Sequence, residues 1–431
     1  MRPIPKDRGR PRSLIPPPTA RELPERRGRA GAEDAMEKLS ISDVELAGKR
    51  VLVRVDFNVP LNERQEVTDD TRIRAALPTI RYALGKRAKV LLVSHLGRPK
   101  GMVVPAMSLA PAAKRLSALL GTPVAMAADC IGGAAETAAE RLTPGQILML
   151  ENCRFHAGDE KNDDTMSRAL ASLCDVFVND AFGAAHRAHS STVGVTRFVP
   201  LAVAGFLMGR ELEYLGRAMT NPVRPFVAIL GGAKVSDKIG VLKNLVTKVD
   251  ALVVGGGMAY TFLKSQGLEI GASLLEVDKL EVARDILDAA RANGVAFLLP
   301  MDHVIARKVA ADAETQVADS TAIPAGWMGL DIGPKAREGF ATAIRGAKTV
   351  LWNGPMGVFE LAPFREGTFA VACAIAESGA TSIVGGGDSV AAVTQAGLAD
   401  RMTHVSTGGG ACLEFLEGIE LPGVAALTDK T

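Results

Sequence analysis

Residues 229–238 read Ile-Leu-Gly-Gly-Ala-Lys-Val-Ser-Asp-Lys, and the apolar residues Phe226 and Val227 precede them. The apolar residues predict a buried strand, and the pattern that follows them predicts a helix. Glycines at such a turn let backbone N–H groups approach an anion, and the start of the helix adds a partial positive charge. We expect Lys234 and Lys238, four residues apart, to lie on one face of a helical turn. The stretch therefore favours a polyphosphate site, with a tight turn and two solvated lysines as the alternative; it does not match the Walker motif.

Composition describes a globular protein with a large core. The 431 residues are 47% hydrophobic and 23% charged, which is enough chain for two domains or three small ones. A net charge of +2 argues against a protein that mainly holds nucleic acid. The five cysteines are widely spaced without a C-x-x-C pair, which favours free thiols in a reducing compartment. Because no apolar run is long enough to cross a bilayer, we expect a cytoplasmic protein without a membrane segment.

The first 35 residues differ from the rest of the chain. They contain eight arginines and seven prolines without apolar periodicity, which is typical of a disordered extension. Five acidic residues and little serine count against a transit peptide. Met36 begins a segment with globular character, so an over-extended start is favoured over a functional tail.

From Met36 onward, short apolar segments alternate with helical patterns. This alternation predicts an α/β fold of parallel sheets with right-handed crossovers. Strands are predicted at 51–53, 90–93, 147–150, 176–178, 226–230, 251–254, 296–299, 350–352 and 383–384. One predicted helix face carries Ile73, Leu77, Ile80 and Leu84. A domain junction is expected between Val199-Pro200 and Asn221-Pro222, across a connecting helix.

In the first half, arginines and histidines follow the predicted strands. Ligands of open α/β sheets bind at the carboxyl ends of the strands, and arginine suits bidentate capture of phosphate or carboxylate. The sequence therefore predicts an anion site, although any single arginine is more often paired with a neighbouring Asp or Glu. The cations at these positions are Arg54, Arg72, Arg98, Arg154 and Arg187, with His95, His186 and His189 beside them.

In the second half, the predicted strands end in glycine. Flat glycine loops admit a purine base and a phosphate chain without side-chain collisions. Asp388 ends one such loop and suits magnesium, which takes one or two carboxylates plus phosphate oxygens. Glu360 is a candidate for a ribose hydroxyl. The glycine runs are 231–232, 255–257, 385–387 and 408–410, together with Gly354. An arginine-lined domain facing a glycine-lined domain predicts an anionic acceptor, a nucleotide and closure before reaction.

From about Met36 to Leu427 the chain resembles phosphoglycerate kinases. The motifs that carry the resemblance are RVDFNVP at 54–60, SHLGRP at 94–99, VNDAFGAAHRAHSS at 178–191, GGAKVSDK at 231–238, GGGM at 255–258, WNGPMGVFE at 352–360, GGGD at 385–388 and STGGG at 406–410. The resemblance implies a monomer with two Rossmann-like domains that uses Mg²⁺ and ATP or ADP. It implies an extension at 1–35, a 3-phosphoglycerate-binding domain at 36–205, an interdomain helix at 206–220, a nucleotide-binding domain at 221–405 and a segment at 406–431 that returns to the first domain.

The resemblance also implies roles for individual residues, and it implies reversible phosphoryl transfer between 1,3-bisphosphoglycerate and ADP in glycolysis and gluconeogenesis. The expected catalytic residues are Arg72, Lys234 and Lys238. The expected substrate residues are Asp56, Asn58, Arg72, His95, Arg98, Arg154 and Arg187. The expected nucleotide residues are Gly232, Ala233, Lys234, Lys238, Gly256, Gly329, Asn353, Glu360, Gly386, Gly387, Asp388 and Ser389, with Asp388 also at the metal.

Two other hypotheses make different predictions. A catalytically silent relative that acts as a binding protein would have lost at least one of Arg72, Lys234, Lys238 and Asp388, and all four are present. A nicotinamide dehydrogenase would need G-x-G-x-x-G between a strand and a helix, which the glycine runs do not match.

Overall fold

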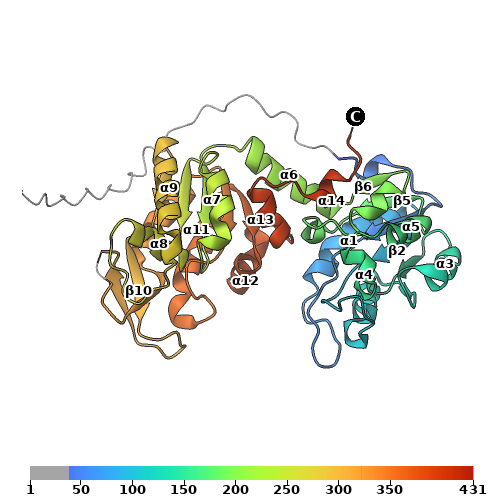
Figure 1. Cartoon of the computed structure of the whole chain (residues 1–431), viewed down its shortest axis with the longest axis horizontal. Helices are drawn as coiled ribbons and strands as arrows, with labels where there is room; N and C mark the ends of the chain where they lie inside the picture. Colours follow the sequence, from blue (N-terminus) through green and yellow to red (C-terminus); the bar gives the residue numbers. More distant parts are fainter. Residues whose placement is uncertain (1–37, 322, 431) are drawn as a thin grey trace, which may run out of the picture.

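The computed structural model describes residues 38–321 and 323–430. The expected extension at 1–35 lies outside them. Two lobes, each built on a parallel sheet, lie at either end of the molecule, and α6 (Phe206–Thr220) lies between them (Figure 1). The predicted α/β fold with two parallel sheets is confirmed. No helix in the described part of the chain is both long and apolar enough to span a bilayer.

The first lobe contains a six-stranded parallel sheet in the order β3-β4-β2-β1-β5-β6. Its strands are β1 (Arg50–Arg54), β2 (Lys89–Val93), β3 (Ala125–Met126), β4 (Ile147–Met149), β5 (Val176–Asn179) and β6 (Ala202–Ala204). Its helices are α1 (Thr71–Gly85), α2 (Ala110–Leu120), α3 (Gly132–Glu140), α4 (Ala157–Glu160) and α5 (Asp164–Ser172). The predicted face of α1 buries Ile73, Leu77 and Ile80. Apolar strands covered by helices on both faces explain the continuous runs in the sequence.

The second lobe contains a parallel sheet in the order β15-β14-β13-β7-β8-β9. Its strands are β7 (Phe226–Leu230), β8 (Ala251–Val254), β9 (Ala296–Leu298), β13 (Thr349–Asn353), β14 (Thr381–Gly385) and β15 (His404–Val405). Its helices are α7 (Ile239–Leu245), α8 (Met258–Ser265), α9 (Leu280–Ala292), α10 (Pro334–Arg345), α11 (Glu366–Glu377) and α12 (Gly387–Gln395). Trp352 in the central strand β13 is completely buried, so the core of this lobe lies around β13.

A second, antiparallel sheet in this lobe was not foreseen from the sequence. It has the order β11-β10-β12 and consists of β10 (Asp302–Ala306), β11 (Thr315–Asp319) and β12 (Met328–Ile332). The residues of β11 are mostly exposed, so its apolar pattern is too weak to predict a strand.

The C-terminal residues pack against the first lobe. They include α13 (Gly410–Leu416) and α14 (Pro422–Ala425). The Gly423 N–H donates to the Ala185 carbonyl at 2.8 Å, and the Thr428 N–H donates to the Ala202 carbonyl at 2.9 Å. Figure 1 shows α14 beside β6, far along the chain from it. The chain therefore passes between the lobes twice, once through α6 and once through the segment after β15.

Candidate functional site

The loop after β1 carries Asp56 and Asn58, and Arg72 reaches them from the first turn of α1. Arg72 Nη1 donates to Asp56 Oδ2 at 3.0 Å and to the Asn58 carbonyl at 3.2 Å. Asn58 Oδ1 accepts from the Gly97 N–H at 2.9 Å, which joins this loop to the one after β2. Burial acts to raise the pKa of Asp56, but the neighbouring His95 ring and the guanidinium charges of Arg72 and Arg54 outweigh it and hold the pKa below its usual value. Asp56 is therefore an ionised acceptor beside a half-exposed guanidinium.

Arg54, at the end of β1, is completely buried beneath this loop. Its Nε donates to Ser191 Oγ at 3.1 Å, and its Nη2 lies 3.1 Å from His95 Nδ1. The expectation that Arg54 joins the anion cluster is wrong, because internal partners occupy its guanidinium. Arginine can only donate, so His95 Nδ1 must accept and the ring proton must be on Nε2. Burial lowers the pKa of His95 to about 3, so the ring is a neutral donor at physiological pH.

Three further arginines lie in the loops at the carboxyl edge of the first sheet. Arg154, after β4, donates from Nη1 to the Gly97 carbonyl at 3.0 Å, and its Nε lies 3.6 Å from Glu160. Arg98 and Arg187, in the loops after β2 and β5, are exposed, and their guanidinium groups make no hydrogen bond or ion pair with any residue that the structure describes. Since the carboxyl ends of parallel strands lie along one edge, this edge carries free guanidinium groups.

The loop after β5 packs against the segment that follows β15. A Cβ at Gly183 would lie 2.7 Å from Asp56 Oδ2 and 3.3 Å from the Thr407 carbonyl. A Cβ at Gly408 would lie 2.5 Å from the Phe182 ring. A small hollow here is lined by Asp56, Arg72, Phe182, Gly183, Leu207 and Thr407. The segment after β15, called the returning chain below, therefore lines the same hollow as Asp56 and Arg72 of the first-lobe site.

Glu211 and His404, which sequence reasoning missed, connect α6 to the returning chain. Glu211 is completely buried and accepts from the Thr407 N–H at 2.8 Å, from Thr407 Oγ1 at 3.1 Å and from His404 Nε2 at 2.8 Å. Tyr214 stacks on His404 with 4.9 Å between ring centroids. The sequence did contain a signal for Glu211. Glu211 lies four residues before Leu215, so a helix places this charged residue on the same buried face.

In the second lobe, β7 ends directly in the stretch 231–238. The expectation that Lys234 and Lys238 share a helical face is wrong, because Lys234 precedes the 3₁₀ helix η6 (Ser236–Lys238) and α7 begins at Ile239. Lys238 Nζ donates to Asn353 Oδ1, and burial lowers the pKa of this ammonium group. Lys234 and Ala233 are exposed, and Lys234 has no ion pair among the described residues.

The glycines of this lobe let three loops pack backbone to backbone. The Gly232 N–H donates to the Pro355 carbonyl at 3.0 Å, and the Gly256 N–H donates to the Met356 carbonyl at 3.1 Å. Gly256 has φ +68°, and a Cβ there would lie 2.6 Å from the Gly232 carbonyl oxygen. Glycine is therefore required for packing in addition to any role in ligand binding.

At the end of β13, Asn353 lies between Lys238 and the start of α12. Its Nδ2 is buried and has no hydrogen-bond partner among the described residues, although buried donors are nearly always paired. Gly386 precedes α12, Gly387 begins it, and Asp388 is exposed in its first turn. Ser389 Oγ instead accepts from the Gly354 N–H at 2.5 Å. An orphaned amide donor beside an ammonium group suits an anionic ligand.

Two other residues predicted to bind the nucleotide, Gly329 and Glu360, make no side-chain or N–H hydrogen bond to these glycine loops among the described residues. Gly329 is buried in β12, donates its N–H to Ser273 Oγ at 2.9 Å and has no room for a Cβ beneath the Tyr260 hydroxyl. Glu360 is exposed after β13.

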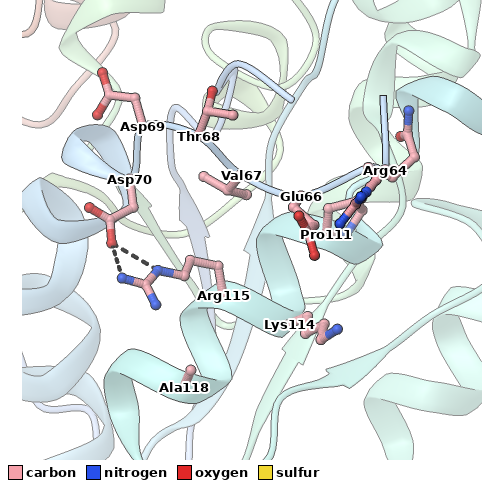
Figure 2. Close-up of a pocket in the computed structure, with 11 residues that line it drawn as sticks. Arg64, Glu66, Val67, Thr68, Asp69, Asp70, Pro111, Lys114, Arg115 and Ala118 are labelled. Atoms are coloured by element: carbon pink, nitrogen blue, oxygen red, sulfur yellow. Dashed lines mark hydrogen bonds and ion pairs between the residues drawn. The ribbon is translucent and has the colours of Figure 1, made fainter. Parts of the chain in front are cut away.

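An open pocket of the first lobe contains none of the predicted site residues. It lies between the loop before α1 and helix α2, and its lining includes Arg64, Lys114, Arg115, Glu66, Asp69 and Asp70. Figure 2 shows Arg115 bonded to Asp70, with 2.8 Å from Nε and 2.6 Å from Nη2 to the same oxygen. Because acidic and basic side chains alternate and partly neutralise each other, the pocket has no clear preference for an anion.

Known proteins resemble this chain over nearly its full length. A sequence model described as phosphoglycerate kinase matches residues 41–419. A phosphoglycerate kinase of Acidobacterium capsulatum is 60% identical over 404 residues, covering 92% of this chain and 100% of the relative. A cytosolic phosphoglycerate kinase of Triticum aestivum is 58% identical over 393 residues, covering 90% and 98% of the two chains.

Solved structures agree with these sequence matches. The phosphoglycerate kinase of Coxiella burnetii superposes with a TM-score of 0.83 at 44% identity, covering 90% of this chain and 98% of its own. That of Pyrococcus horikoshii gives a TM-score of 0.78 at 33% identity with the same coverage.

Proposed function

The chain belongs to the phosphoglycerate kinase family, and from this premise we propose that its first lobe binds the phosphorylated acid and its second lobe the nucleotide. The protein is a phosphotransferase with a carboxyl acceptor: it transfers a phosphoryl group between 1,3-bisphosphoglycerate and ADP, giving 3-phosphoglycerate and ATP, in glycolysis. The observation that supports the proposed assignment of sites is that both sheet edges carry cations without an ion pair in the described part of the chain: Arg98 and Arg187 on one edge, Lys234 on the other. The catalytically silent alternative is not favoured.

The acid is held by the guanidinium groups of the first lobe. Arg98, Arg154 and Arg187 bind the 3-phosphate, since several guanidinium groups along one edge repel each other unless an anion joins them. The neutral ring of His95 donates from Nε2 to the same phosphate. Asp56 and Asn58 bind the hydroxyl and the carboxyl end of the acid.

The nucleotide is held by the glycine loops and by two lysines. Lys234 and Lys238 contact its phosphates, and Asn353 Nδ2 gains the acceptor that it lacks within the described part of the protein. Gly232, Ala233, Gly256 and the 386–389 loop line the phosphate chain. Glu360 binds the ribose, and Gly329 lies at the base.

Magnesium fits Asp388, an exposed carboxylate of these loops. Asp388 is exposed in the first turn of α12 without an ion pair to any described residue, and Mg²⁺ takes one or two carboxylates plus phosphate oxygens. When bound, the ion neutralises charge on the nucleotide phosphates.

The chemistry requires alignment and positive charge more than proton transfer. The attacking carboxylate of 3-phosphoglycerate is already ionised at neutral pH, so no general base is needed. Arg72 gives up its contact with Asp56 and stabilises the equatorial oxygens of the transferred phosphoryl group, and Lys234 does so from the opposite lobe. Approach of the lobes excludes water, which would otherwise hydrolyse the nucleotide. We further propose that the enzyme acts as a cytoplasmic monomer.

A coupled assay of ATP consumption with 3-phosphoglycerate, with and without magnesium, tests this assignment. Arg72→Ala and Lys234→Ala are each expected to lower kcat by about 10²–10³-fold while the protein stays folded. Arg64→Ala, an exposed arginine of the loop before α1, is the matched control and should retain normal turnover. Near-normal kcat in either site variant would show that the assignment is wrong.

A further inference from the structure

Outside the phosphoryl-transfer site, an aspartate, a cysteine and a histidine converge in the first lobe. Asp129 and Cys130 lie between β3 and α3, and His156 lies directly before α4. Each offers one ligand atom, and these three atoms lie within 4.8 Å of one another. The side chains of His156 and Asp129 are 34% and 42% exposed, whereas Cys130 is completely buried. The group therefore has one inner sulfur and two outer donors that solvent can reach.

The Cys130 thiol is unpaired although it is buried. It makes no hydrogen bond with any residue in 38–321 or 323–430, whereas the buried Cys153 thiol donates to Asp159 Oδ2 at 3.3 Å and the Cys174 thiol to the Ala171 carbonyl at 3.6 Å. The two outer side chains are already oriented toward each other, since His156 Nε2 lies 2.6 Å from Asp129 Oδ1. A structural ion pair explains that contact, and Cys130 packs in the apolar core of the lobe, but neither feature uses the thiol as a donor or acceptor.

The types of ligand atom at this group indicate which metal ion it would bind. Sulfur and imidazole nitrogen with a single carboxylate suit zinc and its chemical relatives, while magnesium and calcium prefer oxygen ligands alone. A tetrahedral zinc ion with ligand bonds of about 2.0–2.3 Å places its ligand atoms about 3.3–3.8 Å apart. The aspartate–histidine contact would open by about 1 Å to reach that separation, which two partly exposed side chains can accommodate.

We propose that Asp129, Cys130 and His156 form a zinc-type metal site whose fourth position is open to solvent. Binding releases the thiol proton to solvent and leaves a thiolate on the ion. The Cys130 N–H donates to Asp129 Oδ1 at 2.6 Å, so the backbone orients the carboxylate oxygen that faces His156. The ion would join the loop before α3 to the loop before α4, two residues beyond Arg154.

Cobalt(II), titrated into the chelator-treated full-length protein, tests the site directly. Cobalt bound by a thiolate absorbs in the near ultraviolet by charge transfer, a signal that does not depend on kinase activity. We expect one equivalent of this absorption, which zinc abolishes and excess magnesium leaves unchanged. Cys130→Ser should remove the signal, and Cys174→Ser, a buried cysteine of the same lobe with its own acceptor, should retain it.

His156→Asn and Asp129→Asn keep the test decisive if Cys130→Ser does not fold, because both side chains are partly exposed. Each should weaken cobalt binding by about tenfold or more. The proposal is overturned if the wild-type protein gives no thiolate signal, if Cys130→Ser retains it or Cys174→Ser loses it, if magnesium abolishes it, or if neither outer variant changes the affinity.

Discussion

Glu211→Ala is expected to destabilise the connection between the two lobes. The substitution leaves the Thr407 N–H, the Thr407 hydroxyl and His404 Nε2 without their common acceptor in a fully buried position. A hydrogen bond to a charged group contributes about 1.5–3 kcal/mol, and breaking a buried pair by removing one partner costs about 3–5 kcal/mol. Because the three bonds share one acceptor, their contributions do not add, and we expect a loss of about 3–5 kcal/mol in the free energy of unfolding.

Scanning calorimetry measures this loss as a shift in Tm. For a domain of this size, about 3–5 kcal/mol corresponds to roughly 6–20 °C. Glu213→Ala is the matched control on the same helix, since its 3.3 Å ion pair with Arg217 is exposed and should be worth less than about 2 °C. Glu211→Gln should fall between them, because its carbonyl oxygen still accepts from Thr407. Equal Tm values for Glu211→Ala and Glu213→Ala would refute the argument that Glu211 anchors the returning chain.

Three other predictions address protonation, space and charge. Burial raises the pKa of Asp180 from 3.8 to about 7, so the folded state binds a proton that the unfolded state releases; the resulting stability is present below about pH 4 and is lost as the pH rises to about 7. Asp180→Asn should therefore flatten the fall in Tm between about pH 4 and about pH 7, and parallel profiles would contradict the assignment. Gly183→Ala places a Cβ 2.7 Å from Asp56 Oδ2 and should lower kcat/KM by about tenfold or more. Gly85→Ala is the control and should not change kcat/KM, because the space around Gly85 is open. Equal kcat/KM values for the two variants would contradict the close approach of Gly183 to Asp56. Lys238→Met should lower kcat by about 10²–10³-fold. Lys243 is exposed on α7, so Lys243→Met is the control and should leave kcat unchanged. A normal kcat for Lys238→Met would exclude contact between Lys238 and the transferred phosphate.

Much of the fold and of the candidate site could be predicted because both follow local patterns. Buried parallel strands are continuous apolar runs, so β1, β2, β7 and β13 were predicted within a few residues. The polar and glycine clusters follow these strands directly, which is why the sequence alone predicts that they share an edge. The strand β11 was missed because most of its residues are exposed and show no alternating pattern.

The errors concern the direction in which side chains point. Arg54 is the last residue of β1 and Arg98 lies in the loop after β2, yet only the Arg54 guanidinium turns inward, to Ser191 and His95. The sequence near Arg54 does not predict this direction, because its side-chain partners Ser191 and His95 come from distant segments. Likewise, the turn after β7 delays the helix until Ile239, which places Lys234 outside it.

The amino-acid sequence by itself determined the α/β class, the family and the set of cations and glycines available for phosphate, since periodicity and motifs are properties of neighbouring residues. Only the tertiary structure decided which cations are free, that His95 is a neutral donor, and that Glu211, His404 and Thr407 join the lobes. Burial and pairing depend on segments that are distant in the chain, and the local sequence does not specify which of them meet.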